Sequence, residues 1–162
     1  MAEGVLVLRG GCQCGAVRYA ARAENGDAYY CHCRMCQRAF GNLFGVFVAV
    51  GREGLTWERG EPAYFRSSAI ARRGFCRECG TPLTFEYLDE GRKIDVTVGS
   101  LDEPGRVRPV GHFGSESIVH SFFTDDGLPQ ERTEDDEELA ARWRAARDAD
   151  PGIGPVSGPS RP

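Results

Sequence analysis

Seven cysteines carry most of the chemical information in this sequence, and they fall into three short segments. The segments contain Cys12 and Cys14, then Cys31, Cys33 and Cys36, and then Cys76 and Cys79. An odd number of cysteines, with no secretory signal in front of them, argues against a disulfide framework. Cysteine thiolates are typical zinc ligands, four in a closed structural site and three in a site that keeps one position open. Seven cysteines therefore predict one closed site and one open site.

The spacing inside each segment indicates how the sulfur atoms are presented. Residues i and i+2 of an extended strand face the same side, so each Cys-x-Cys pair offers two sulfurs to one metal. His32, between Cys31 and Cys33, then points away and is interpreted as a bystander. The Cys-x-x-Cys spacing of Cys76 and Cys79 instead suits a tight turn around one ion.

Spacing alone leaves open how the cysteines divide between two metals. A zinc-ribbon arrangement would combine Cys33 and Cys36 with Cys76 and Cys79. Glycine follows both Cys14 and Cys79, whereas Gln37 follows Cys36, and glycine permits a backbone turn that most residues resist. This detail favours a different division. It gives one site of Cys12, Cys14, Cys76 and Cys79 and another of Cys31, Cys33 and Cys36.

The elements that must position these cysteines are expected to be strands within a single domain of 162 residues. From Val5 to about residue 123, runs of Val, Phe, Tyr and Thr alternate with Gly and Pro, as in an all-β domain. Residues 34–39 are expected to form a compact turn. The expected strands cover residues 5–8, 16–20, 28–31, 43–50, 55–58, 63–66, 70–75, 83–87, 93–98 and 118–123.

The C-terminal part has a different composition. Residues 131–150 hold eight acids and four arginines, with the acids first, which suits a helix dipole. We expect an amphipathic helix over residues 134–149 that starts near Thr133 and docks Trp143 on the domain. The predicted organisation is a zinc-binding β domain at 5–131, the helical segment at 132–150 and a disordered tail at 151–162.

Charge and hydropathy exclude several classes of protein. The net charge of −4 provides no basic footprint, so we expect no nucleic-acid partner. The apolar run from Val5 to Leu8 is too short for a signal peptide or a membrane span, so we expect no membrane association. A cytoplasmic, reducing compartment follows from the same observations.

Three runs of residues resemble the glutathione-dependent formaldehyde-activating enzyme family, which includes a centromere-protein V-like branch. The runs are GGCQCGAVRY at 10–19, CHCRMCQRAFG at 31–41 and FCRECGTPLTF at 75–85, within a resemblance that covers roughly residues 9–130. The resemblance implies a β-tent fold with two zinc ions. It implies a structural zinc on Cys12, Cys14, Cys76 and Cys79 and a second zinc on Cys31, Cys33 and Cys36.

The resemblance also implies a carbon–sulfur lyase that joins glutathione to formaldehyde as S-hydroxymethylglutathione. Three thiolates mute the Lewis acidity of zinc but suit a fourth, soft thiolate, so Cys31, Cys33 and Cys36 are the predicted catalytic centre. Arginine can grip the carboxylates of glutathione. Arg34 and Arg38 are the first candidates for this role, and Arg72, Arg73 and Arg77 are further ones unless they are ordinary surface charges. The candidate acid–base groups are Asp95, Asp102, His112 and His120, although residues of this kind without a neighbouring partner in the sequence are more often structural hydrogen-bonding groups.

Two functions remain open from the sequence. The first is a zinc enzyme that forms or breaks a thiol–aldehyde adduct, with a glutathione-like thiol and an aldehyde as its small-molecule partners. The alternative is a non-catalytic, zinc-stabilised protein-binding module. The alternative predicts that a residue such as His112 or His120 closes the three-cysteine site as a fourth ligand.

Overall fold

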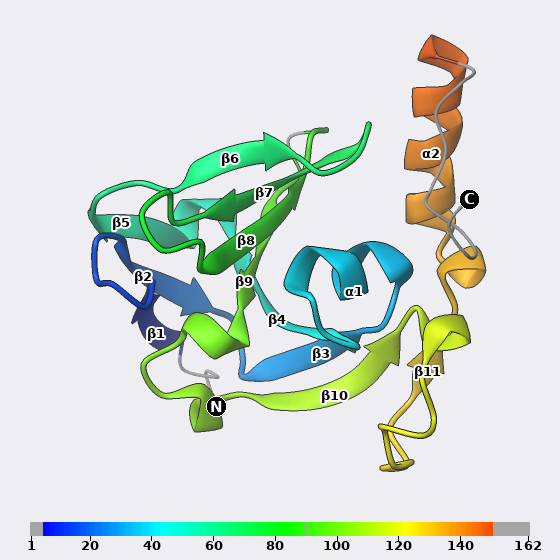
Figure 1. The fold of residues 1–162 in the computed structure, drawn as a ribbon, viewed down its shortest axis with the longest axis horizontal. Coiled ribbons are helices and arrows are strands. Elements are labelled where there is room, and N and C mark those ends of the chain that lie inside the picture. Colours follow the sequence, from blue (N-terminus) through cyan, green and yellow to red (C-terminus); the bar gives the residue numbers. More distant parts are fainter. Residues whose placement is uncertain (1–4, 90, 151–162) are drawn as a thin grey trace.

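Strands are the main regular secondary structure of the computed structural model, which describes residues 5–89 and 91–150 (Figure 1). The described strands are β1 (Leu6–Gly11), β2 (Arg18–Ala23), β3 (Asp27–Cys31), β4 (Gly45–Gly51), β5 (Leu55–Arg59), β6 (Ala63–Arg66), β7 (Ala71–Phe75), β8 (Pro82–Tyr87), β9 (Lys93–Thr97), β10 (Arg108–Phe113) and β11 (Gln130–Glu131). The described α-helices are α1 (Arg34–Phe40) and α2 (Glu137–Ala149). The predicted fold class, mainly β with a C-terminal helix, is confirmed. The tail expected at 151–162 lies outside the described residues.

The strands form a small sheet and a large one. The small sheet has the antiparallel order β1-β2-β5, and the large sheet has the order β11-β10-β3-β4-β9-β8-β7-β6. Within the large sheet, β10 runs parallel to both β3 and β11, and the other pairs are antiparallel. The main core contains side chains of both sheets, among them Leu8, Tyr19, Val48, Leu83 and Val96. Burial of this apolar surface is the main driving force that holds the two sheets together.

A second, aromatic core surrounds α1. Cys36 and Phe40 of α1 pack against Phe47 of β4, Phe85 of β8 and Phe113 of β10. In Figure 1, α1 accordingly lies between the strands β7 and β8 above it and β3 and β10 below it. The short helix thus occupies the opening of the bent large sheet. The sequence predicted a compact turn at residues 34–39, and the structure has the helix α1 there.

The strand predicted at 118–123 is wrong. A strand there would need an unpaired sheet edge, but β11 takes the edge beside β10, with His112 opposite Gln130. Residues 118–123 instead form turns, and Phe123 packs edge-on against the rings of Tyr30 and His112. Aromatic burial therefore outweighs the local strand pattern at this position.

The strand β10 was not predicted, for a related reason. Pro109 lacks a backbone donor, and Gly111 has no side chain to pack, so both lower the strand signal. The structure accommodates them with a register shift between Pro109 and His112 where β10 pairs with β3. Long-range pairing with β3 therefore forms a strand that the local sequence does not specify.

The C-terminal helix α2 begins at Glu137, later than predicted. Its N-cap is Asp136, whose carboxylate accepts from the backbone N–H of Leu139 at 2.9 Å, so Thr133 lies before the helix in a short 3₁₀ segment. Trp143 is buried against Ile70 and neighbouring residues, as predicted. In Figure 1, α2 stands beside the sheets and is not part of either.

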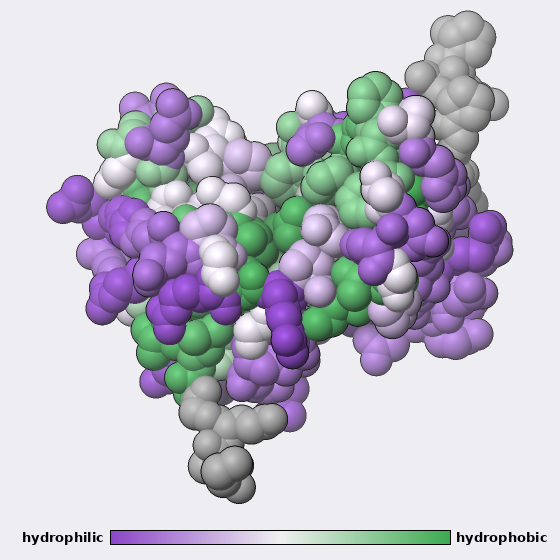
Figure 2. Space-filling view, turned by 90° about the horizontal axis from the view of Figure 1, so that it is seen from below, coloured by the Kyte–Doolittle hydropathy of each residue, from purple (hydrophilic) through white to green (hydrophobic). Residues whose placement is uncertain are grey.

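The outer surface mixes polar and apolar residues. Figure 2 shows the face seen from below in Figure 1, where green apolar patches lie between purple hydrophilic ones. No helix in the described part of the chain is long and apolar enough to span a bilayer.

Candidate metal centres and active site

Four sulfur atoms meet where the segment after β1 approaches the segment after β7. Cys12 and Cys14 lie 3.5 Å apart at Sγ, and Cys14 and Cys76 lie 3.8 Å apart. Together with Cys79, these sulfurs lie within 4.8 Å of one another. We call this group the four-cysteine cluster.

Glycine makes both turns of the four-cysteine cluster possible. Gly15 has φ of 78° and Gly80 has φ of 76°, a left-handed conformation that residues with a Cβ adopt rarely. The N–H of Gly15 donates to the carbonyl of Cys12 at 3.1 Å, and the N–H of Gly80 donates to that of Cys76 at 2.8 Å. In both turns the glycine after the second cysteine donates to the carbonyl of the first, across three residues in one turn and four in the other.

Hydrogen bonds to sulfur stabilise thiolates at two cysteines of this cluster. The backbone N–H of Val17 donates to Cys12 Sγ at 3.2 Å. The Thr81 hydroxyl lies 3.1 Å from Cys79 Sγ, and this contact, with the backbone N–H of Thr81, lowers the pKa of Cys79 to about 6. Metal ions of zinc type bind the deprotonated sulfur, so the donor set fits such an ion.

The other three cysteines gather at the start of α1. Cys31 is the last residue of β3, Cys33 is the N-cap of α1, and Cys36 lies in the first turn of the helix. Cys31 and Cys33 lie 3.5 Å apart at Sγ, and all three sulfurs lie within 4.8 Å of one another. The backbone N–H of Cys36 donates to Cys33 Sγ at 3.4 Å. We call this group the three-cysteine cluster.

Arg73, one of the further arginine candidates from the sequence, contacts a cysteine of this cluster. Its side chain is buried, with 5% of the residue exposed, and its Nη2 donates to Cys36 Sγ at 3.3 Å. The guanidinium lies over the ring of Phe85 at 4.8 Å from the centroid. Among the described residues, Arg73 forms no ion pair with a carboxylate, although burial raises the pKa of Asp95 and the charge of Arg73 partly offsets this rise. A divalent ion with three thiolates would carry one net negative charge, which Arg73 would neutralise.

A cavity of about 610 Å³ opens at the three-cysteine cluster. Its walls come from β3, α1, β4, β7, β8, the segment before α2 and α2 itself. They include Tyr29, Cys31, Cys33, Arg34, Met35, Cys36, Phe47, Ile70, Arg73, Phe85, Tyr87, Glu116, Glu134, Leu139, Trp143 and Arg147. None of the cysteines of the four-cysteine cluster lines it. The volume suits a small-molecule ligand, for which about 300–1,000 Å³ is usual.

A neighbouring cavity of about 380 Å³ contains Asp95 and shares Tyr29 with the first cavity. Burial raises the pKa of Asp95 to about 6, although its hydrogen bond with Tyr29 opposes the shift. Burial also raises the pKa of Tyr29 well above its ordinary value, so this hydroxyl keeps its proton. Asp95 is thus a carboxyl group that can exchange a proton near neutral pH.

His32 and His112 form a buried hydrogen-bonded chain with Asp126. His32 Nε2 lies 2.9 Å from His112 Nδ1, and His112 Nε2 lies 2.9 Å from Asp126 Oδ1. The carboxylate can only accept, so His112 carries its proton on Nε2 and accepts from His32 through Nδ1. His32 Nδ1 is buried and lacks a partner among the described residues. Both nitrogens of His112 are therefore engaged away from the cysteines.

The remaining candidates from the sequence lie in different places. Arg34 lines the large cavity and donates to the side chain of Gln37, whereas Arg38 is exposed on α1 and does not line the cavity. Arg72 pairs with the buried Glu86 at 2.9 Å. Asp102 pairs with Arg18 at 2.9 Å, which gives it a structural partner. Arg77 and His120 are exposed.

The fold and the paired cysteine clusters define a mainly β protein with two candidate metal centres. The family model of the glutathione-dependent formaldehyde-activating enzyme matches residues 7–117. The chain therefore belongs to this family, as the three cysteine segments predicted.

Two individual proteins are similar to this chain. An uncharacterized lyase of Schizosaccharomyces pombe is 32% identical over 80 residues, which cover 49% of this chain and 58% of that protein. The chain therefore matches somewhat over half the length of this curated relative. The crystal structure of a Rhodobacter sphaeroides protein is 26% identical, with a TM-score of 0.51, and covers 62% of this chain and 97% of that one.

Proposed function

We propose that the chain is a zinc-dependent enzyme of carbon–sulfur lyase type that forms or breaks a thiol–aldehyde adduct. S-hydroxymethylglutathione, from glutathione and formaldehyde, is the adduct that the family name suggests. The observation that carries the proposal is the difference between the clusters. Four sulfurs complete one set of ligands, whereas three sulfurs line a cavity of about 610 Å³. The free thiols of both clusters suit the reducing cytoplasm.

The seven cysteines would hold two zinc ions. Cys12, Cys14, Cys76 and Cys79 would hold a structural ion, which four thiolates close. Zinc on Cys31, Cys33 and Cys36 would supply, when bound, a position that accepts a soft sulfur ligand from the substrate. The fit rests on the donor sets described above and on the charge of Arg73 beside Cys36.

The chain's own groups would handle the oxygen and the proton of the reaction. When the adduct forms, a sulfur–carbon bond is made, the carbonyl π electrons move onto oxygen, and the thiol proton ends on that oxygen. Arg73 Nε–H is buried and lacks a partner among the described residues, so it is free to donate to the substrate oxygen. Tyr29, hydrogen-bonded to Asp95, lines the same cavity and would relay the proton.

Recognition of glutathione would fall to arginines at the cavity. Arg34 and Arg147 both line it and can bind carboxylates. Arg38, the second candidate from the sequence, would have to contact a part of the substrate that extends outside the cavity. Arg34 is therefore the stronger of the two sequence candidates.

The non-catalytic module is the weaker alternative. It requires a fourth protein ligand at the three-cysteine cluster, and His112 and His120 were the candidates. His112 is hydrogen-bonded at both ring nitrogens, and His120 is exposed. Neither belongs to the group of ligand atoms around Cys31, Cys33 and Cys36.

The direct test is adduct exchange between glutathione and ¹³C-labelled formaldehyde, measured by NMR exchange spectroscopy. The zinc-loaded protein should accelerate exchange above the spontaneous rate, and Cys33→Ala and Cys36→Ala should return it to that rate. Arg77→Ala, an exposed change beside the other cluster, is the matched control and should stay active. Full activity in the two cysteine variants would falsify the assignment of the three-cysteine cluster as the catalytic centre.

A further inference from the structure

We infer that the cavity at the three-cysteine cluster selects adducts with a bulky apolar group, and that α2 is the element that recognises this group. The inference rests on the proposed function in one respect, because the substrate sulfur is taken to lie at Cys31, Cys33 and Cys36. It adds a substrate class that formaldehyde and glutathione alone do not require.

The cavity is lined by polar and by apolar side chains, which we call its polar and apolar ends. Polar and charged side chains, among them Arg34, Glu116 and Glu134, come from α1 and from the segments before α2. Ile70, Leu139 and Trp143 form the apolar end, where Ile70 and Trp143 belong to one buried apolar cluster and Leu139 packs against it. A ligand with a polar part and an apolar part would match both ends.

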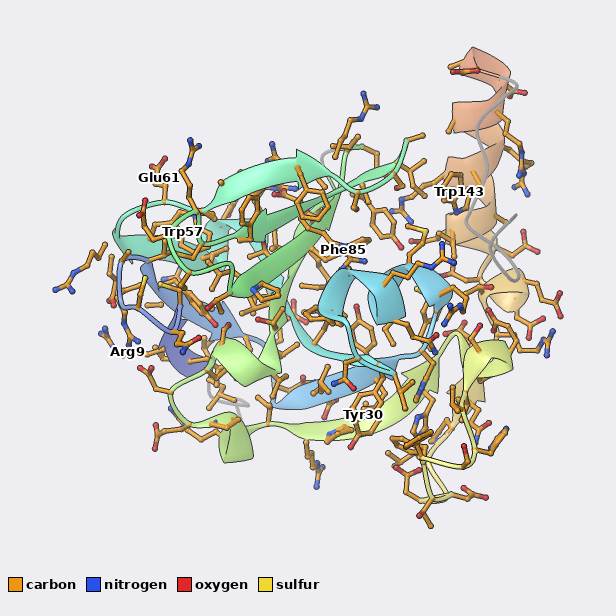
Figure 3. The ribbon with its side chains drawn as sticks, viewed as in Figure 1. Arg9, Tyr30, Trp57, Glu61, Phe85 and Trp143 are labelled. Atoms are coloured by element: carbon orange, nitrogen blue, oxygen red, sulfur yellow. The ribbon has the colours of Figure 1, made fainter. Side chains whose placement is uncertain are left out.

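The apolar end is large for a one-carbon aldehyde. Met35, Phe85, Tyr87 and Leu139 surround the buried cluster of Ile70 and Trp143 and line the same cavity. In Figure 3, Trp143 projects from α2 toward the body of the fold, and Phe85 lies inside it above α1. Formaldehyde brings one carbon, and the polar groups of glutathione would lose their hydration against these side chains. An alkyl or aryl group would gain from the same contact.

The helix α2 is fixed in place without help from a ligand. Arg142 pairs with Asp89 at 2.6 Å, and its guanidinium lies 4.0 Å from the centroid of the Tyr87 ring. Asp136 caps the N-terminus through Leu139. These contacts do not involve the side chain of Leu139, so they remain when Leu139 is changed, whereas Trp143→Ala also removes the buried side chain of α2.

Selectivity and chemistry are separate along the chain. All three cysteines of the cluster and Arg73 fall within residues 7–117, which the family model matches, whereas Leu139 and Trp143 lie beyond them. The part of the apolar end that α2 contributes thus comes from outside the matched region, whereas Ile70 and Phe85 lie within it. This arrangement would let the chain share the metal chemistry of the family and select adducts that carry a larger apolar group.

A series of straight-chain thiols tests the inference through binding alone. Ethanethiol, butanethiol and hexanethiol are titrated into the zinc-loaded protein by calorimetry. In the adduct, the sulfur of the thiol is bonded to the carbon of the aldehyde. An n-alkyl thiol therefore probes the apolar end whether the thiol part or the aldehyde part of the natural adduct carries the apolar group. Each methylene that becomes buried should strengthen binding about fourfold. In Trp143→Ala and in the milder Leu139→Asn, the increment should fall below about twofold.

Arg144→Ala is the matched control, because Arg144 is exposed on the same helix and should leave the increment unchanged. Circular dichroism confirms that each variant keeps α2. Adduct exchange with glutathione then compares hexanal with formaldehyde, which shows whether the aldehyde half carries the group. Wild-type protein should prefer hexanal, and Trp143→Ala should lose the preference if this half is the apolar one.

Equal affinity for the three thiols in the wild-type protein would overturn the inference, as would an unchanged increment in both cavity variants. If formaldehyde exchange persists in that case, the proposed function stands and only the apolar selectivity is lost. If no thiol binds and no aldehyde exchanges, the proposed function fails, and the inference fails with it.

Discussion

The two cysteine clusters use the same side chain in different surroundings. In the four-cysteine cluster, glycine turns and the backbone hold the sulfurs, and the cavity beside α1 does not reach them. In the three-cysteine cluster, the sulfurs lie between a helix N-terminus, a buried arginine and a cavity. The comparison teaches that the number of ligands is only part of the difference. The four-cysteine cluster is held within its own turns near the surface, whereas the three-cysteine cluster faces a cavity that other elements shape.

The largest expected effect is the loss of a ligand from the four-cysteine cluster. Cys76→Ser should lower the free energy of unfolding by more than about 3 kcal/mol, because a structural zinc site contributes directly to folding. Cys33→Ser should change it far less while abolishing adduct exchange. Urea denaturation and metal content measure both variants. Equal losses of stability in the two variants would show that the four-cysteine cluster does not contribute more to folding than the three-cysteine cluster.

The second effect concerns Arg73. Arg73→Leu removes the positive charge beside Cys36 and should weaken zinc binding at the three-cysteine cluster about 10- to 100-fold, the usual range for groups that support a metal site. Zinc in the four-cysteine cluster should remain. Competition with a chromogenic chelator resolves the two ions. The exposed Arg77→Leu is the control, and matching behaviour of the two variants would refute the role of Arg73.

The third effect is a pH dependence centred on Asp95, whose pKa is raised from 3.8 to about 6 by burial. The unfolded chain ionises this carboxyl first, so the wild-type protein loses stability as pH rises from about 4 to about 6. Asp95→Asn should therefore be more stable by about 1–2 kcal/mol at pH 7, with no gain below about pH 4. Thermal melts across this range measure the difference. A gain that is independent of pH would contradict the raised pKa.

The smallest effect concerns Asp126, which accepts from His112 beside the three-cysteine cluster. Asp126→Ala leaves this buried donor without its partner, and it should cost about 1 kcal/mol of stability because water can reach the vacated position. Zinc content should be unchanged, since the chain of histidines supplies no ligand. Chemical denaturation tests the cost. A loss of zinc would instead connect Asp126 to the metal.

The sequence was most informative where the backbone itself constrains the site. Glycine after Cys14 and Cys79 predicted the four-plus-three division, because both glycines adopt a positive φ that other residues resist. Alternating and apolar runs predicted most strands within a few residues of their ends. Val48, for example, lies in a strand with neighbours on both sides and is buried, as its apolar surroundings indicated.

The sequence was least informative where burial depends on distant partners. Arg73 is one of several arginines near Cys76, and nothing local distinguishes it from the exposed Arg77. Only the pairing of β7 with β8 and the position of α1 turn Arg73 toward Cys36. The position of His112 was likewise not predictable, because it lies on β10, and Pro109 and Gly111 weaken the strand signal of that segment. Contacts between segments far apart in the chain determine the burial and orientation of these two side chains, and such contacts cannot be read from a single sequence.

The contact between Cys14 and Cys76 joins positions 62 residues apart, whereas Cys31 and Cys36 are only five residues apart. Closing the longer loop in an unfolded chain costs about 2 kcal/mol more in entropy. A nascent or unfolded chain can therefore capture an ion first on the short motif, and the long-range set becomes available only after β1 and β7 have met. Occupancy of the four-cysteine cluster would then report that β1 and β7 have come together.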